Sequence, residues 1–177
     1  DCIHTTAASH GRVFIVEVMG HKVGWLTLYA GLAGGAEIIL LPEIPYDINA
    51  VCDAIVKRAK AGKRFSILAV AEGAISKEDA SMTKKGLKEK KKNGMVYPGH
   101  MQRGGEPCPY DRVLATRLGA AAAKLISEEK YGYMVAVKNG ELTDVPLSEV
   151  AGKLKTVDPQ CSMIREAKMV GISFGDQ

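Results

Sequence analysis

The chain has 177 residues, of which 46% are hydrophobic and 25% are charged, and its formal net charge is +4. This composition is typical of an ordinary globular domain with a real core, and it excludes a disordered or low-complexity protein. The mild positive charge suits an anionic small molecule and gives no argument for binding nucleic acid.

The chain shows no sign of a membrane or secreted protein. No apolar run approaches the length of a membrane span. The four cysteines are Cys2, Cys52, Cys108 and Cys161, and none of them forms a Cys-x-x-Cys pair. We therefore expect reduced, unlinked thiols in a cytoplasmic protein. Six lysines lie between positions 84 and 92, and we interpret them as the solvated face of a helix.

The first part of the chain predicts alternating strands and helices. Residues 13–19 form an apolar, β-branched run that is typical of a strand buried on both faces. A helix is expected at 25–33, stopped by a pair of glycines, and a second buried strand at 37–41. An amphipathic helix follows, capped by Asp47 and ended by Gly62.

The rest of the chain continues this alternation. The expected elements are a buried strand at 65–71, a polar helix at 77–92, a short strand at 95–97, a helix at 111–129 and a hairpin over 133–145, before short helical or irregular segments. Such alternation predicts a three-layer α/β fold with a mainly parallel sheet and right-handed crossovers. Residues 1–177 are expected to form a single α/β unit.

Polar groups gather where the predicted strands end. The first strand ends at residues 19–21, the second at 42–43, the third at 72–73, and the fourth runs into the loop 99–105. In open α/β sheets, ligands bind beyond the carboxyl ends of the strands. The sequence therefore predicts a binding site along this one edge of the sheet.

The loop 99–105 is the most informative of these segments. Arg103 offers a planar fork of donors that matches phosphate oxygens, and the neighbouring glycines let backbone amides approach an anion. His100 adds a further donor whose charge is tunable near neutral pH. By composition alone, a glycine-rich turn with a surface arginine is an equally good interpretation of this loop.

Several common motifs do not occur in the sequence. There is no Gly-x-x-x-x-Gly-Lys-Ser/Thr phosphate loop and no Gly-x-Gly-x-x-Gly after a predicted strand. The four histidines show no metal-ligand spacing. The sequence alone therefore gives no nucleotide or metal site.

Two motifs carry a family resemblance: a Glu-Val-Met-Gly turn at 17–20 and a His-Met-Gln-Arg-Gly-Gly loop at 100–105. In this order and strand context, they resemble the phosphofructokinase family, and more specifically its C-terminal, substrate-binding half. The likeness covers most of the chain, through the stretches 8–12, 17–24, 34–43, 71–72 and 99–112. The family phosphorylates the 1-hydroxyl of fructose 6-phosphate in glycolysis.

The resemblance implies a role for each matching residue. His100 and Arg103 would bind the 6-phosphate, and Glu72 would accept hydrogen bonds from sugar hydroxyls. Met19 and Gly20 would line the sugar pocket. A dianion held in this way positions the distant reacting hydroxyl.

Three further positions bear on the assembly and on turnover. The resemblance implies that Arg12 reaches the 6-phosphate of a neighbouring subunit, so that a homo-oligomer, dimer or tetramer, would share its active sites. His21 is the expected catalytic residue, because it stands where the family usually has an arginine that helps with charge on the transferred phosphoryl group. A histidine does so only when protonated. Gly94 falls where many members have a second phosphate-binding arginine.

The family's donor-binding parts do not occur in the sequence. Its Gly-Gly-Asp phosphate loop and its Thr-Ile-Asp segment with the catalytic aspartate lie upstream of the residues present here. Mg²⁺ with ATP or pyrophosphate would be bound mainly by that N-terminal part, so the fragment alone is expected to be inactive. The sequence leaves the donor open. It also leaves two alternative functions: a non-catalytic sugar-phosphate-binding or regulatory module, and a stand-alone α/β protein that binds another anion.

Overall fold

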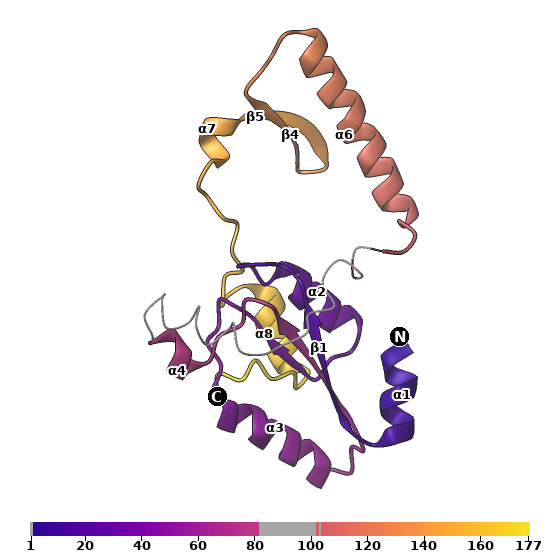
Figure 1. Cartoon of the computed structure of the whole chain (residues 1–177), viewed down its shortest axis with the longest axis vertical. Coiled ribbons are helices and arrows are strands. Elements are labelled where there is room, and N and C mark those ends of the chain that lie inside the picture. The colour runs from indigo at the N-terminus through magenta and orange to yellow at the C-terminus, as the bar shows by residue number, and fades with distance from the viewer. Residues whose placement is uncertain (1, 82–101, 103) are drawn as a thin grey trace. The chain divides into compact units, whose positions relative to one another are not determined.

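The computed structural model describes residues 2–81, 102 and 104–177. The chain divides into two compact units (Figure 1). Unit 1 consists of residues 1–102 together with 156–177, and unit 2 of residues 103–155. That the whole chain forms a single α/β unit stays a prediction.

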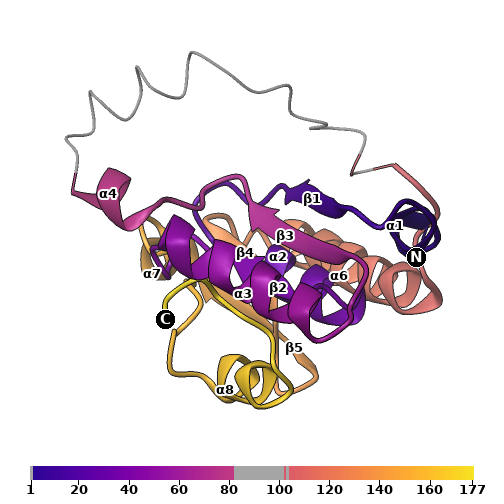
Figure 2. The same cartoon turned by 90° about the horizontal axis from the view of Figure 1, so that it is seen from below.

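Unit 1 is built on a parallel sheet of three strands, β1 (Val13–Val18), β2 (Ile38–Leu40) and β3 (Ser66–Ala71). The order is β1-β3-β2, so the central strand is the last of the three in the chain. Val13 pairs with Ser66, and Ile38 pairs with Leu68. Figure 2 shows β1 and β3 side by side. The predicted parallel α/β sheet is therefore confirmed, and its three strands end at one common edge.

Helices cover both faces of this sheet. They are α1 (Cys2–His10), α2 (Trp25–Ala33), α3 (Ile48–Lys60) and α8 (Ser162–Met169). Unit 1 also contains the short helix α4 (Lys77–Ala80), which has no buried residue. Successive residues of β2 point to opposite faces, as the strand period requires. Ile39 belongs to the core cluster that holds Leu28 of α2 and Ile164 of α8, whereas Ile38 and Leu40 belong to a second cluster with Val51 of α3.

The helices α2 and α3 begin and end as the sequence predicts. Asp47 caps α3 through its carboxylate, which accepts a hydrogen bond of 2.8 Å from Asn49 N. Gly31 lets α2 lie close against the sheet, because a β-carbon at this position would stand 2.7 Å from Ile39 Cδ1. The cap determines where α3 begins, and Gly31 determines how closely α2 packs on the sheet.

The expected burial of the first strand on both faces is wrong for the described residues. Val13 is 44% exposed and Ile15 is 69% exposed, while the alternate residues Phe14 and Val16 pack against the core. The physical reason is that β1 lies at the edge of the described sheet. The second core cluster, which includes Val51 of α3, contains no residue of β1. An apolar run does not distinguish an edge strand from a central one.

The last residues of the chain extend the sheet on its other side. Ile39 N donates to Ser173 O (2.9 Å) and Ser173 N donates to Glu37 O (3.0 Å), so this segment runs parallel to β2. Phe174 is fully buried in the core that contains α8. Helix α1 and this terminal bridge are features that the sequence did not lead us to expect.

Unit 2 contains helix α6 (Pro109–Ser127), the hairpin of β4 (Tyr133–Lys138) and β5 (Glu141–Pro146), and the short helix α7 (Leu147–Val150). The strands are antiparallel, and the two turn residues Asn139 and Gly140 both have positive φ angles, 53° and 83°. These values are typical of the Asn-Gly hairpin turn. The predicted helix and hairpin are confirmed.

Two other expectations fall on the part of the chain that is not described. The polar helix predicted at 77–92 is seen only as α4, and the short strand predicted at 95–97 lies outside the described residues. Of the helices described, none has both the length and the apolar character needed to cross a membrane.

Candidate functional site

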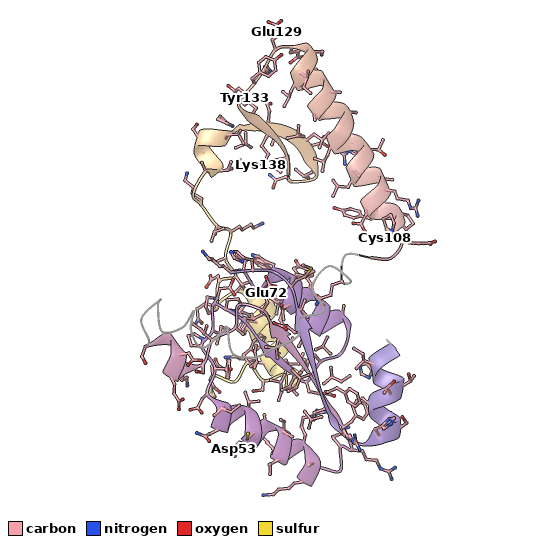
Figure 3. All side chains as sticks on the ribbon, viewed as in Figure 1. Asp53, Glu72, Cys108, Glu129, Tyr133 and Lys138 are labelled. Carbon is pink, nitrogen blue, oxygen red and sulfur yellow. The ribbon has the colours of Figure 1, made fainter. Side chains whose placement is uncertain are left out.

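The candidate site is the edge of unit 1 where its three parallel strands end. Beyond this edge, β1 continues into residues 19–24, β3 into Glu72 and Gly73, and β2 into Pro42 and Glu43. Figure 3 labels Glu72 on the segment that follows β3. The gathering of polar groups that the sequence predicts at this edge is therefore present in the structure for these three loops.

Direct contacts join the loops that follow β1 and β3. His21 N donates a hydrogen bond to Glu72 Oε1, and Glu72 N donates to Val18 O at 3.0 Å. Gly73 lies so close to His21 that a β-carbon on it would collide with the carbonyl oxygen of His21 and would stand 3.2 Å from Pro42 Cγ. Only glycine fits here, and the three loops form one packed cluster.

The carboxylate of Glu72 is oriented by this contact. One of its oxygens accepts from the backbone of His21, which holds the side chain over the end of β1. An ionised carboxylate has two oxygens and about four acceptor positions, so one backbone bond leaves capacity for a hydroxyl. The geometry therefore provides a fixed acceptor next to Met19 and Gly20.

The side chain of Gln102 reaches the same edge. Its Oε1 accepts from Met19 N at 3.0 Å, and its Nε2 donates to Glu17 O at 2.9 Å. The side-chain amide thus continues the hydrogen-bond ladder just where β1 ends. In the sequence, Gln102 stands out only as one member of the His-Met-Gln-Arg-Gly-Gly motif. The signal that could have found it is that a carboxamide offers one acceptor and two donors, and so can pair with a strand's backbone.

Two expected site residues of this loop, His100 and Arg103, lie outside the described residues. Gln102 between them is described, and it is fixed to β1 through its side chain. The phosphate-binding role of His100 and Arg103 stays a prediction.

Arg12 lies far from the other expected residues in this chain. It directly precedes β1 and is exposed, whereas Met19 directly follows the same six-residue strand. At about 3.3 Å per strand residue, the two lie roughly 20 Å apart. The structure therefore places Arg12 at the amino edge of the sheet, opposite Glu72.

His21 is exposed and adopts a positive φ of 56°. Its backbone N–H donates a hydrogen bond to the carboxylate of Glu72. The turn around it is closed by a hydrogen bond of 3.1 Å from Val23 N to Gly20 O. A positive φ is uncommon for residues other than glycine and deserves a functional explanation. Here it accompanies the tight packing of His21 against Gly73.

Glu43 is a further residue whose role the sequence did not reveal. Its Oε1 accepts from two backbone groups, Gly24 N at 3.0 Å and Val157 N at 2.9 Å. In the sequence, Glu43 stands out only as a polar residue at the end of the second predicted strand. Because Val157 is distant in the chain, no local pattern could have predicted this contact.

The part of the chain that the structure describes contains no group of three or more His, Cys, Asp or Glu side chains arranged to hold a metal ion. We therefore derive no step through a metal from these residues.

The family is decided by comparison with known proteins. The family model described as Phosphofructokinase matches residues 1–126. The chain belongs to the phosphofructokinase family. It is 48% identical to the ATP-dependent 6-phosphofructokinase of Spirochaeta thermophila and 43% identical to ATP-dependent 6-phosphofructokinase 3 of Bacteroides thetaiotaomicron. Each alignment covers 99% of this chain and 54% of the relative.

Solved phosphofructokinases share the fold. The enzyme of Pichia pastoris in the T-state matches with a TM-score of 0.65 at 38% identity, over 84% of this chain and 18% of that one. The pyrophosphate-dependent phosphofructokinase of Marinobacter aquaeolei matches with a TM-score of 0.69 over 97% of this chain and 50% of that one. At 21% identity, the second likeness shows the fold alone. The chain spans about half the length of the curated phosphofructokinases it matches.

Proposed function

We propose that this chain is the sugar-phosphate-binding part of a 6-phosphofructokinase, which transfers a phosphoryl group to the 1-hydroxyl of fructose 6-phosphate. The observation that carries the proposal is the cluster at the carboxyl edge, where Glu72 holds the backbone of His21 and Gln102 holds the end of β1. The names of the relatives favour an enzyme over a non-catalytic module.

In this function, the edge cluster binds the acceptor sugar. Glu72 accepts hydrogen bonds from sugar hydroxyls, and Met19 and Gly20 form the wall beside it. His100 and Arg103 bind the 6-phosphate in this proposal, because they are neighbours in sequence of Gln102, which is bonded to the end of β1. Binding the phosphate at one end of the sugar positions the 1-hydroxyl at the other, which lowers the entropic part of the barrier.

His21 supplies positive charge to the transferred phosphoryl group when its ring is protonated. Its backbone is fixed between Glu72 and Gly73, so its position follows that of the sugar-binding carboxylate. Charge held in place before the reaction stabilises the transition state without a reorganisation cost. An imidazole carries this charge only in its protonated form.

Arg12 completes the site of a neighbouring subunit in a homo-oligomer, either a dimer or a tetramer. The support is its exposed position at the sheet edge opposite Glu72, from which it does not reach the cluster of its own chain. Mixing subunits tests this role. Arg12→Ala and Glu72→Gln subunits are each expected to be weakly active, and a mixed oligomer regains native sites only if each site takes Arg12 and Glu72 from different chains.

The phosphoryl donor is ATP or pyrophosphate with Mg²⁺, held mainly by the N-terminal part of the full-length protein. Relatives with the higher identity are named ATP-dependent, while pyrophosphate-dependent enzymes share the fold. The charge assistance of His21 is compatible with either donor. We also infer a cytoplasmic location, as suits an enzyme of glycolysis.

The direct test is steady-state kinetics of the full-length protein with fructose 6-phosphate and each donor. Arg103→Ala should raise the KM for fructose 6-phosphate roughly 10- to 100-fold, which corresponds to a lost charged hydrogen bond of about 1.5–3 kcal/mol. The KM for the donor should not change. Arg64→Ala is the matched control, because Arg64 is exposed just before β3 at the opposite edge. Equal damage to both substrates would contradict the proposal.

A further inference from the structure

The carboxylate of Glu43 joins three separate segments at the carboxyl edge of the sheet. Glu43 follows β2, and its Oε1 accepts from Gly24 N at the start of α2 and from Val157 N in the C-terminal segment of unit 1. The other oxygen, Oε2, is buried, and it has no hydrogen-bond partner among the described residues. The carboxylate of Glu43 is therefore buried from solvent, and its described hydrogen bonds are to backbone N–H groups.

The contact with Gly24 is close. A β-carbon on Gly24 would stand 2.7 Å from Glu43 Oε2 and 2.9 Å from Leu41 Cδ2. Gly24 is buried and serves as the N-cap of α2, where backbone N–H groups have no partner within the helix. The carboxylate satisfies one of these groups and fixes where the helix begins.

This bond also fixes the end of the loop 19–24, which contains the expected site residues Met19, Gly20 and His21. The loop begins at Met19 N, which donates to Gln102, and it is held in the middle by the bond from His21 N to Glu72. Its last residue, Gly24, is held by Glu43. Side-chain acceptors from three different segments therefore hold the beginning, the middle and the end of one short loop.

We propose that Glu43 is a positioning residue for the sugar site: by anchoring Gly24 N, it fixes the loop that presents Met19, Gly20 and His21. This role rests on the proposed function of the edge cluster. Glu43 does not touch the substrate but acts through the backbone of the loop. Loss of the anchor lets the loop shift, and a shift of about 1 Å at a reacting centre can cost roughly 100-fold in rate.

Glu37 provides a matched control on the same strand. It precedes β2, as Glu43 follows it, and its side chain also joins separate segments. Glu37 Oε1 accepts from Arg58 Nη2 at 2.6 Å, and Oε2 accepts from Ile67 N at 2.6 Å. Both glutamates therefore stabilise unit 1, but Glu37 does so at the amino edge, away from the loop 19–24.

The experiment compares Glu43→Ala, Glu43→Gln and Glu37→Ala in the full-length protein, by thermal melting and by kinetics with fructose 6-phosphate and ATP or pyrophosphate. Both alanine variants should lower the Tm. Only Glu43→Ala should lower kcat/KM for fructose 6-phosphate, by about 10- to 100-fold, with the KM for the donor unchanged. Glu43→Gln should stay within a few-fold of the wild type, because its carbonyl oxygen still accepts from Gly24 N and Val157 N.

Distinct results would overturn the proposal. Kinetics of Glu43→Ala that match those of Glu37→Ala would show that Glu43 only stabilises the fold. If Glu43→Ala does not fold, Glu43→Asp decides, since the shorter side chain keeps the charge but withdraws from Gly24 N: native kinetics in that variant would refute the role. A wild-type protein that does not phosphorylate fructose 6-phosphate would overturn the proposed function itself, and the role of Glu43 with it.

Discussion

Replacing Gly73 by alanine tests whether the loops at the candidate site are packed as tightly as the structure shows. A β-carbon on Gly73 would stand closer than 3.0 Å to the carbonyl oxygen of His21, whereas ordinary contact begins at 3.4 Å. The obstacle is backbone, which cannot rotate away as a flexible side chain does. The loops after β1 and β3 must therefore separate, and the bond from His21 N to Glu72 must lengthen or break.

The size of the effect follows from this geometry. Forcing a methyl group into a closely packed position costs about 1–3 kcal/mol in the free energy of unfolding. A separation of roughly 1 Å between Glu72 and the backbone of His21 should lower kcat/KM for fructose 6-phosphate by about 100-fold. The KM for the donor should change much less, because the displaced groups face the acceptor sugar in the proposed function.

Urea denaturation and steady-state kinetics of the full-length protein measure these two effects. Gly119→Ala is the matched control: it lies inside α6, and apart from its chain neighbours and the backbone of its own helix, no atom of the described part of the chain comes within 4 Å of its added β-carbon. That variant should gain up to about 1 kcal/mol from helix propensity and keep native kinetics. If Gly73→Ala were as stable and as active as the wild type, the packing argument would be refuted.

Three other substitutions give further tests in the full-length protein. Gln102→Leu removes both bonds at the end of β1 and should raise the KM for fructose 6-phosphate about 5- to 50-fold, at an unchanged KM for the donor; an unaltered sugar KM would speak against its role. Arg58→Ala should lower the free energy of unfolding, measured in urea, by about 1.5–3 kcal/mol. The reason is that the carboxylate of Glu37, whose side chain is only 17% exposed, loses its cationic partner. A smaller loss would mean that water takes the place of the guanidinium. Thr27→Val should leave the free energy of unfolding unchanged or raise it by up to about 1 kcal/mol. The reason is that Thr27 Oγ1 is buried and has no hydrogen-bond partner among the described residues. A clear decrease in the free energy of unfolding would show that the hydroxyl has a partner.

The helices and strands that the sequence predicts well are those with local signals. Asp47 is a good N-cap and does cap α3, and Asn139-Gly140 forms the expected hairpin turn. Helix α1 has no such signal, because its threonines, serine and histidines are weak helix formers. It is held by tertiary contacts instead: Ala7 is fully buried, and the ring of His4 hydrogen-bonds to Gly34 O at 2.7 Å.

The place of the site could be predicted, but its internal contacts could not. Parallel strands must end at one edge, so the convergence of Met19, Glu72 and Glu43 follows from the order of strands and helices. The contacts of Gln102 and Glu43 join segments far apart in the chain, and they depend on the register of the sheet. How far β1 is buried depends on the elements packed beside it, and the apolar sequence of the strand itself does not reveal them.

Unit 1 is interrupted by residues 103–155, and this has a consequence for how the protein folds as it is made. Val157, Ile164 and Phe174 are buried in the same core as Leu28 of α2, and Ser173 pairs beside β2. These contacts cannot form until the segment 156–177 has been synthesised, long after the three strands. Unit 2 is continuous in sequence, so its contacts join residues that are synthesised close together in time, whereas the core of unit 1 must wait for its last helix. During that interval, the apolar face that α8 will cover is open to chaperones and to aggregation.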